Sequence, residues 1–157
     1  MLKSSRKIIQ GRYVMSKTIE YSFNGYAATV ITPDKPNGKW IWKTEFLYAF
    51  DKAEQALVED GYTRVNYKIS DMYGSYNAVR LMHAFHLDLL TRFPLCKKAN
   101  LFGFSRGGLY AFNYSLFYPE YVDKVYLDAP VLDLASWPWE DSPEQAGMLE
   151  EYCLTKD

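Results

Sequence analysis

One serine lies in a setting that suits nucleophilic chemistry. The sequence reads Gly103-Phe104-Ser105-Arg106-Gly107-Gly108, with an apolar run before it and an apolar helical pattern after it. A chain that turns sharply from a strand into a helix holds one residue in a strained conformation, and glycines on either side make room for it. This pattern predicts that the Ser105 hydroxyl lies at a strand tip, where it can attack an electrophilic carbon. A phosphate-binding loop is disfavoured, because a glycine is missing before the helix and no lysine has the required spacing.

The composition fits one globular domain. The chain has 157 residues, of which 48% are hydrophobic and 17% aromatic, enough for a sizeable core. Its net charge of −1 gives no electrostatic case for nucleic acid or an acidic membrane surface. Cys96 and Cys153 have no metal-like spacing, which favours reduced thiols and a cytoplasmic protein. Residues 1–16 are basic without the apolar stretch of a secretory signal, so we expect a disordered leader followed by a domain at 17–157.

Hydrophobic patterns predict a hairpin and then alternating strands and helices. Asn24-Gly25, between two β-rich runs, is a strong signal for a tight turn. The order predicts an α/β sheet, antiparallel at its first strand and parallel after, with helices on both faces. Ligands collect at the carboxyl ends of such strands, where Ser105 falls. Strands are expected at 19–23, 26–32, 39–44, 63–69, about 98–104 and 122–128, and helices at 50–60, from 75 to just before Pro94, about 106–117 and 142–152.

The chain resembles the α/β-hydrolase family, and more narrowly its bacterial serine esterases. The resemblance lies in Gly103 to Leu109, in Tyr126-Leu127-Asp128-Ala129-Pro130 to Asp133, in Ser136-Trp137-Pro138 and in Asp71 to Ser75. It implies a three-layer fold, incomplete at the C-terminal side, and a small-molecule carboxylic ester as substrate. Ser105 would form the acyl-enzyme, without metal or organic cofactor. The backbone N–H of Arg106 would be one oxyanion donor, and the loop around Glu45 or Phe46 would supply the second.

The histidine of this family's catalytic triad has no counterpart in the sequence. In the family the acid and then the histidine follow the serine, but no histidine follows Ser105. His83 and His86 precede it on a predicted helix against the sheet face, away from the strand tips. Their spacing would suit a metal pair, but a third ligand is lacking and we expect packed structural histidines. Asp128 ends the next strand, where we favour a structural or substrate-contacting role, with the Arg106 side chain as its candidate partner, over that of catalytic acid.

Trp137, Pro138 and Trp139 form an aromatic turn past the same strand tip. This turn is either the wall of a substrate pocket or an apolar plug that fixes the loop to the core, and the sequence favours neither.

Two accounts explain the missing histidine. In the first, which we favour, the chain is a C-terminally truncated hydrolase, because otherwise the strand around Val125 would be an open sheet edge. In the second, it is a degenerate hydrolase that binds a ligand or a partner. The same open edge would also allow a homodimer, or an interaction module that pairs with another chain.

Overall fold

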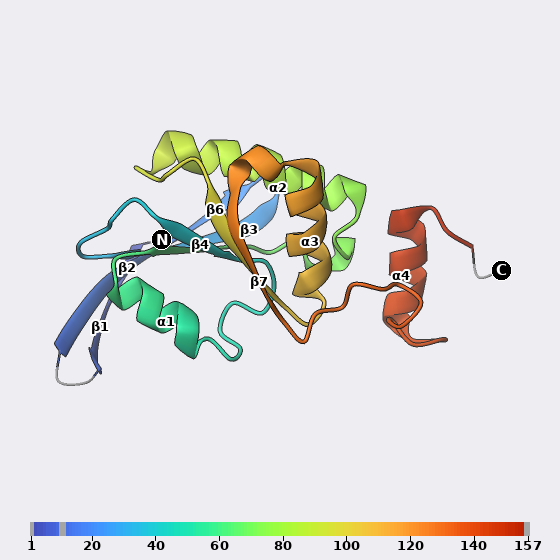
Figure 1. The fold of residues 1–157 in the computed structure, drawn as a ribbon, viewed down its shortest axis with the longest axis horizontal. Helices are drawn as coiled ribbons and strands as arrows, with labels where there is room; N and C mark the ends of the chain where they lie inside the picture. The colour runs from blue at the N-terminus through green and yellow to red at the C-terminus, as the bar shows by residue number, and fades with distance from the viewer. Residues whose placement is uncertain (1, 10–11, 156–157) are drawn as a thin grey trace.

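A single mixed β-sheet organises the chain (Figure 1). The computed structural model describes residues 2–9 and 12–155, and in them seven strands lie in the order β1-β2-β3-β5-β4-β6-β7. The pairs β1/β2, β2/β3 and β3/β5 are antiparallel, whereas β5/β4, β4/β6 and β6/β7 are parallel. This confirms the predicted sheet, antiparallel at its start and parallel after. The strands are β1 (Leu2–Ile9), β2 (Arg12–Phe23), β3 (Tyr26–Pro33), β4 (Trp40–Lys43), β5 (Thr63–Tyr67), β6 (Ala99–Phe104) and β7 (Val122–Asp128).

The N-terminal segment differs from the disordered leader expected at residues 1–16. Leu2–Ile9 pairs with residues 12–19 as an antiparallel hairpin, which extends the sheet by one strand; residues 1, 10 and 11 lie outside the described residues. An edge strand is held by its backbone and often carries charged side chains, so a basic composition does not exclude it. The next turn follows the prediction: Asn24 and Gly25 both have positive φ, 47° and 85°, as a two-residue hairpin turn requires.

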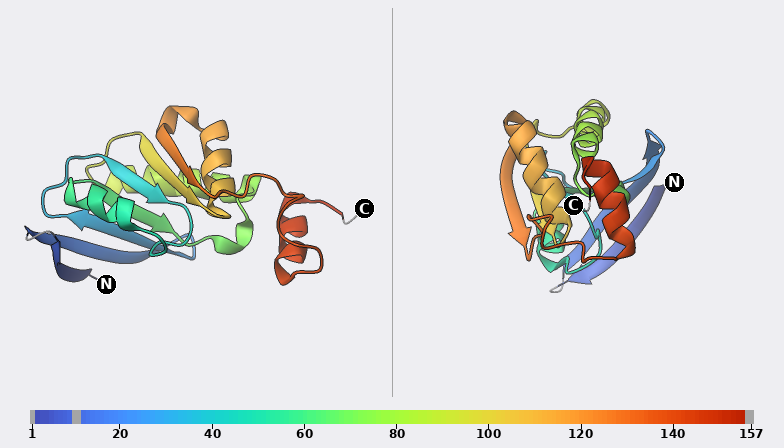
Figure 2. Two further views of the ribbon diagram at one scale, coloured as in Figure 1. Left: turned by 60° about the horizontal axis from the view of Figure 1, so that its bottom comes forward. Right: turned by 90° about the vertical axis from the view of Figure 1, so that its right-hand side faces the viewer.

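Helices cover both faces of the sheet, so the chain forms three layers (Figures 1 and 2). The helices are α1 (Lys52–Glu59), α2 (Tyr76–Arg92), α3 (Gly107–Phe117) and α4 (Pro143–Tyr152), with short 3-10 helices η1 (Ser70–Met72) and η2 (Pro119–Tyr121). Helices α2 and α3 pack on one face and α1 on the other. Helix α4 lies beside η1, away from the sheet. None of the helices in the described residues combines the length and apolarity needed to cross a bilayer.

The apolar core lies between the sheet and helices α2 and α3. Trp42 of β4 contacts Phe85 of α2 with ring centroids 5.5 Å apart, and Tyr67 of β5 stacks on the same ring at 4.4 Å. Because successive residues of a strand point to opposite faces, Lys43, next to Trp42, and Arg64, next to the core residue Val65, point to the α1 side instead, where they pair with Glu54 and Asp51.

The α1 face is therefore partly ionic, which the sequence pattern did not predict. Phe50, Ala53, Ala56 and Leu57 have helical spacing in the sequence and predict an apolar stripe, but this stripe does not face the sheet: Phe50 is 79% exposed, and Ala53 and Ala56 are also exposed. The residues of α1 that are buried are Glu54 and Val58. Glu54 is buried because it pairs with the buried Lys43 of the sheet.

Candidate active site

Ser105 lies at the turn between β6 and α3 with φ of 52°, in the left-handed region that serine rarely adopts. The segment after β7 holds this turn. The Ser105 N–H donates to the Asp128 carbonyl at 3.1 Å, and the Val131 N–H donates to the Ser105 carbonyl at 2.8 Å. Strain of this kind persists only where neighbouring contacts impose it. The strand, the turn and the helix lie where the sequence pattern predicted them.

Glycines around Ser105 let three segments approach it closely. A Cβ on Gly103 would lie 2.9 Å from the Gly107 carbonyl oxygen, and one on Gly108 would lie 2.5 Å from the Pro130 Cβ. A Cβ on Gly107 would lie 3.0 Å from the Thr44 Oγ1. These distances are shorter than normal contacts, so no side chain fits at Gly103 or Gly108 without movement of the backbone.

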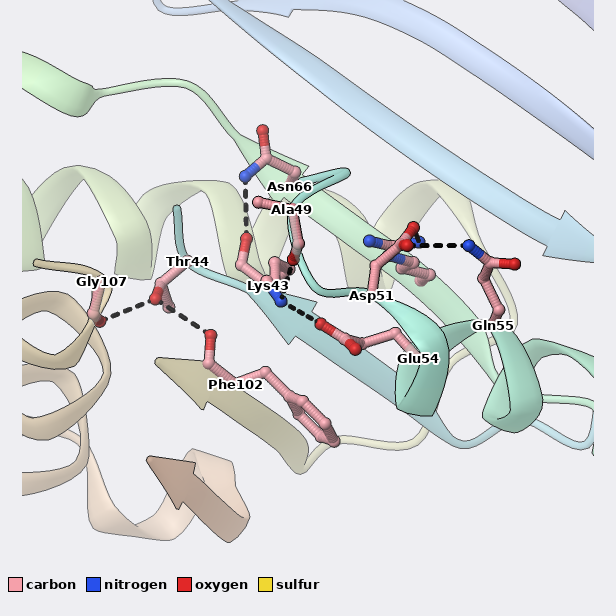
Figure 3. A network of polar contacts seen from close by, with 10 residues as sticks. Lys43, Thr44, Ala49, Asp51, Glu54, Gln55, Asn66, Phe102 and Gly107 are labelled. Carbon is pink, nitrogen blue, oxygen red and sulfur yellow. Dashed lines mark hydrogen bonds and ion pairs between the residues drawn. The ribbon is translucent and has the colours of Figure 1, made fainter. Parts of the chain in front are cut away.

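The loop after β4 reaches the start of α3 (Figure 3). Thr44 Oγ1 donates to the Gly107 carbonyl at 2.8 Å and lies 3.2 Å from the Phe102 carbonyl oxygen. The next two residues are Glu45 and Phe46, and Phe46 has φ of 53°. The structure thus brings the loop around Glu45 and Phe46 next to the turn at Ser105.

Arg106 pairs with Glu45 across this junction. Its Nε donates to Glu45 Oε2 at 3.2 Å, and its guanidinium lies 5.4 Å from the centre of the Phe46 ring. Glu45 is only 3% exposed, and burial raises the pKa of its carboxyl group although the Arg106 charge opposes this rise. Arg106 thus forms its ion pair with Glu45 and not with Asp128, the partner expected from the sequence.

Asp128 and the aromatic turn lie on the other side of Ser105. Asp128 is exposed, and its carbonyl oxygen binds the Ser105 N–H. Trp137 lies against Tyr73, with ring centroids 6.0 Å apart, whereas Trp139 is 75% exposed. Asp128 also borders a small hollow on the α1 side, whose other lining residues are Lys43, Phe50, Ala53, Glu54, Phe102, Gly103, Phe104 and Tyr126.

The two histidines lie at the opposite end of the parallel strands. His86 is fully buried; its Nε2 donates to the Lys97 carbonyl at 2.8 Å, and its Nδ1 accepts from the Tyr114 hydroxyl at 2.8 Å. His83 stacks on Tyr118. Lys97 precedes β6 and Ser105 follows it, and this strand of six residues spans about 20 Å. The histidines are therefore too far from Ser105 to act as its base. Within the described residues no cluster of three or more His, Cys, Asp or Glu could hold a metal.

Sequence reasoning missed the buried ion pair of Lys43 and Glu54 below the loop after β4. A signal was present in Trp40-Ile41-Trp42-Lys43. Central parallel strands are buried on both faces, so a lysine in one requires a buried acceptor.

Comparison with models of known protein families finds no match, and no curated protein matches the chain. Solved structures do match. S-formylglutathione hydrolase from Agrobacterium tumefaciens has a TM-score of 0.66 and 14% identity over 94% of this chain and 67% of that chain. A probable hydrolytic enzyme from Pseudomonas aeruginosa has a TM-score of 0.53 and 22% identity over 78% and 45%. An α/β hydrolase enzyme from a lagoon sediment metagenome has a TM-score of 0.54 and 18% identity over 72% and 52%.

These likenesses and the strand order define the fold. The chain has the α/β-hydrolase fold, and it spans about half to two thirds of the length of these three structures.

Proposed function

We propose that this chain carries the nucleophile of a serine hydrolase that acts on carboxylic esters, with Ser105 as the attacking residue. The observation that carries the proposal is the positive φ of Ser105 at the carboxyl end of β6, between glycines that leave no room for side chains. A strained serine at a strand-to-helix turn is the structural context of this kind of nucleophile. The hydrolase names of the matching structures support the same class.

In the proposed reaction the Ser105 Oγ attacks the acyl carbon, the alcohol leaves with a proton, and water then releases the acid from the acyl-enzyme. The Arg106 N–H, at the start of α3, suits the role of first oxyanion donor because the first N–H groups of a helix lack partners within it. An N–H of Glu45 or Phe46 would be the second. Loss of one such donor typically raises the barrier by about 3–4 kcal/mol.

The proposal requires a general base, and among residues 2–9 and 12–155 no histidine lies beside Ser105. His86 is held at the other end of β6 by Lys97 and Tyr114. Neither His83 nor His86 can therefore serve as that base. Without a base we expect weak turnover, with an acceleration on the order of 10³ over water from the oxyanion hole alone. No metal or organic cofactor enters this scheme, and the free thiols of Cys96 and Cys153 suit a cytoplasmic location.

Labelling with a fluorophosphonate probe tests the proposal. The intact chain should be labelled at Ser105, as located by peptide mass spectrometry, and Ser105→Ala should abolish the signal. Ser115→Ala is the matched control, because Ser115 lies on α3 and its hydroxyl bonds only the Phe112 carbonyl of its own helix. Equal labelling of the chain and the Ser105→Ala variant would refute the assignment.

A second candidate function, pairing through the sheet edge, rests on β7. This strand is the last in the sheet order, and Val125 and Tyr126 on it are 39% and 53% exposed. A second copy could add its own β7 antiparallel to this edge, which would make the chain a binding module rather than an enzyme. Light scattering should then show a dimer that Val125→Lys converts to a monomer, and a monomeric parent chain would contradict this function.

A further inference from the structure

The loop that joins β4 to α1 (residues 44–51) contains two strained residues. Phe46 and Phe50 have φ of 53° and 49°, a region that side chains disfavour. Such residues stay strained only where contacts around them leave no alternative, and they gather at functional sites. The contacts that hold this loop therefore bear on the site at Ser105, which the loop adjoins.

Lys43 holds the loop from inside (Figure 3). Its Nζ donates to the Ala49 carbonyl at 3.1 Å and to the carboxylate of Glu54 on α1. The side chains of Lys43 and Glu54 are only 4% and 2% exposed. A buried ion pair often adds little to the free energy of unfolding, because apolar residues of the same size would give a fold of similar stability. An apolar residue at position 43 would, however, leave the Ala49 carbonyl without its donor.

Further polar contacts hold the two ends of the same loop. At the end near α1, Asp51 accepts from Arg64 at 2.8 Å and from Gln55 at 2.7 Å. At the end near the site, Thr44 binds the Gly107 carbonyl and Glu45 pairs with Arg106. Lys43 thus adds a contact at Ala49, between two ends that other polar contacts already fix.

We propose that Lys43 and Glu54 are positioning residues: Glu54 holds the Lys43 ammonium in place, and Lys43 sets the backbone of residues 44–50 through the Ala49 carbonyl. The inference rests on the proposed function and deepens it, because this backbone would present the second oxyanion donor. Ser105 itself is held separately by Asp128 and Val131. Loss of the pair should therefore disturb the donor and leave the turn at Ser105 in place.

The Ala49 amide is a local reporter for this role. Its N–H donates to the Phe46 carbonyl at 2.9 Å, so its hydrogen exchange follows the opening of this turn alone. Exchange at Val65, which is buried in β5, follows the sheet. If the Lys43–Glu54 pair only stabilised the fold, its loss would accelerate hydrogen exchange at Ala49 and Val65 equally. If the pair positions the loop, its loss accelerates exchange at Ala49 and leaves Val65 unchanged.

The central variant is the double change Lys43→Met with Glu54→Leu, which keeps volume and removes both charges. We expect it to fold, to exchange the Ala49 amide at least tenfold faster at an unchanged Val65 rate, and to slow fluorophosphonate labelling of Ser105 at least tenfold. Glu59→Gln, on the exposed side of the same helix, is the matched control and should change neither rate. Glu54→Gln keeps an oxygen acceptor for Lys43 but removes the paired charge, so it should accelerate exchange at Ala49 more than at Val65.

The outcomes separate this inference from the proposed function. An unchanged Ala49 rate in the folded double variant, or equal acceleration at Ala49 and Val65, would overturn the positioning role. If the double variant exchanges faster at Ala49 but Ser105 is labelled in neither the variant nor the wild type, Lys43 positions the loop and Ser105 is not a nucleophile. If the double variant does not fold, Glu54→Gln decides: an unchanged Ala49 rate, or acceleration at Val65 as large as at Ala49, overturns the inference, and acceleration confined to Ala49 supports it.

Discussion

Acidification should destabilise the chain through His86. Burial lowers the pKa of this imidazole from 6.5 to about 4, because the protonated ring would lose its hydration inside the core. Its Nδ1 accepts from Tyr114, so a proton there would also break a buried hydrogen bond. The groups that face it are His83, Lys97, Tyr114 and Tyr121, and the charges of His83 and Lys97 lower the pKa further.

The direction and the size of this loss of stability follow from the linkage between proton binding and folding. Above pH 6.5 the imidazole is neutral in both the folded and the unfolded chain, so it adds no pH dependence. As the pH falls from 6.5 to 4, the unfolded chain binds a proton that the folded chain does not, and the free energy of unfolding drops. Each pH unit between the two pKa values is worth about 1.4 kcal/mol, so the full loss is about 3 kcal/mol.

Urea unfolding at pH 7.5 and pH 4.5 measures this loss, and His86→Gln isolates it. The glutamine amide can donate to the Lys97 carbonyl as His86 does, but it does not titrate. Other groups contribute to both proteins and cancel in the difference between their slopes. We expect the wild type to lose most of the 3 kcal/mol relative to the variant. Equal slopes, or an NMR titration of the His86 ring near pH 6.5, would refute the reasoning.

Three further changes should have defined effects on the free energy of unfolding. Gly108→Ala places a Cβ 2.5 Å from Pro130 and should cost about 1–3 kcal/mol in urea unfolding. Burial raises the pKa of Glu45 in the folded chain. Its contribution to stability is therefore present below the unfolded-state pKa of 4.5 and is lost as the pH rises through the folded-state pKa. The free energy of unfolding of the wild type minus that of Glu45→Gln should be larger at pH 4 than at pH 7. Ser75 caps α2 by accepting from the Ala78 N–H, so thermal unfolding of Ser75→Ala should show a loss of about 1 kcal/mol.

Much of the fold could be predicted because its core obeys simple periodic rules. The strand predicted at 122–128 is β7, residue for residue, and the helix predicted from position 75 is α2, whose N-cap is Ser75. Continuous apolar runs mark central strands, and Asn24-Gly25 marks the first turn. The pairing of β1 could not be found in this way, because backbone hydrogen bonds hold an edge strand and leave no hydrophobic pattern.

Part of the candidate site could likewise be predicted from the sequence, and part could not. The turn at Ser105 was predictable because close approach requires glycine, and glycine is visible in the sequence. The partner of Arg106 was not, because Asp128 and Glu45 both reach the strand tips and only the packing of the loop after β4 selects Glu45. The face of α1 was predicted wrongly for a related reason. A helical stripe counts apolar residues, whereas this helix buries a carboxylate that is paired with a residue of the sheet.

Apolar packing and polar contacts have different effects on the structure around Ser105. Apolar packing between the sheet and α2 and α3 supplies most of the burial, but such contacts lack direction, and a loop resting on them can shift by a fraction of an ångström at little cost. Hydrogen bonds lose strength steeply with distance and angle, so the contacts of Lys43 and Thr44 fix particular backbone carbonyls, and the pair of Glu45 with the Arg106 side chain ties the loop to the start of α3. A donor that must meet a developing charge needs that accuracy. Burying the charges of Lys43 and Glu54 beneath the loop costs free energy, but it fixes the backbone that would present the oxyanion donor.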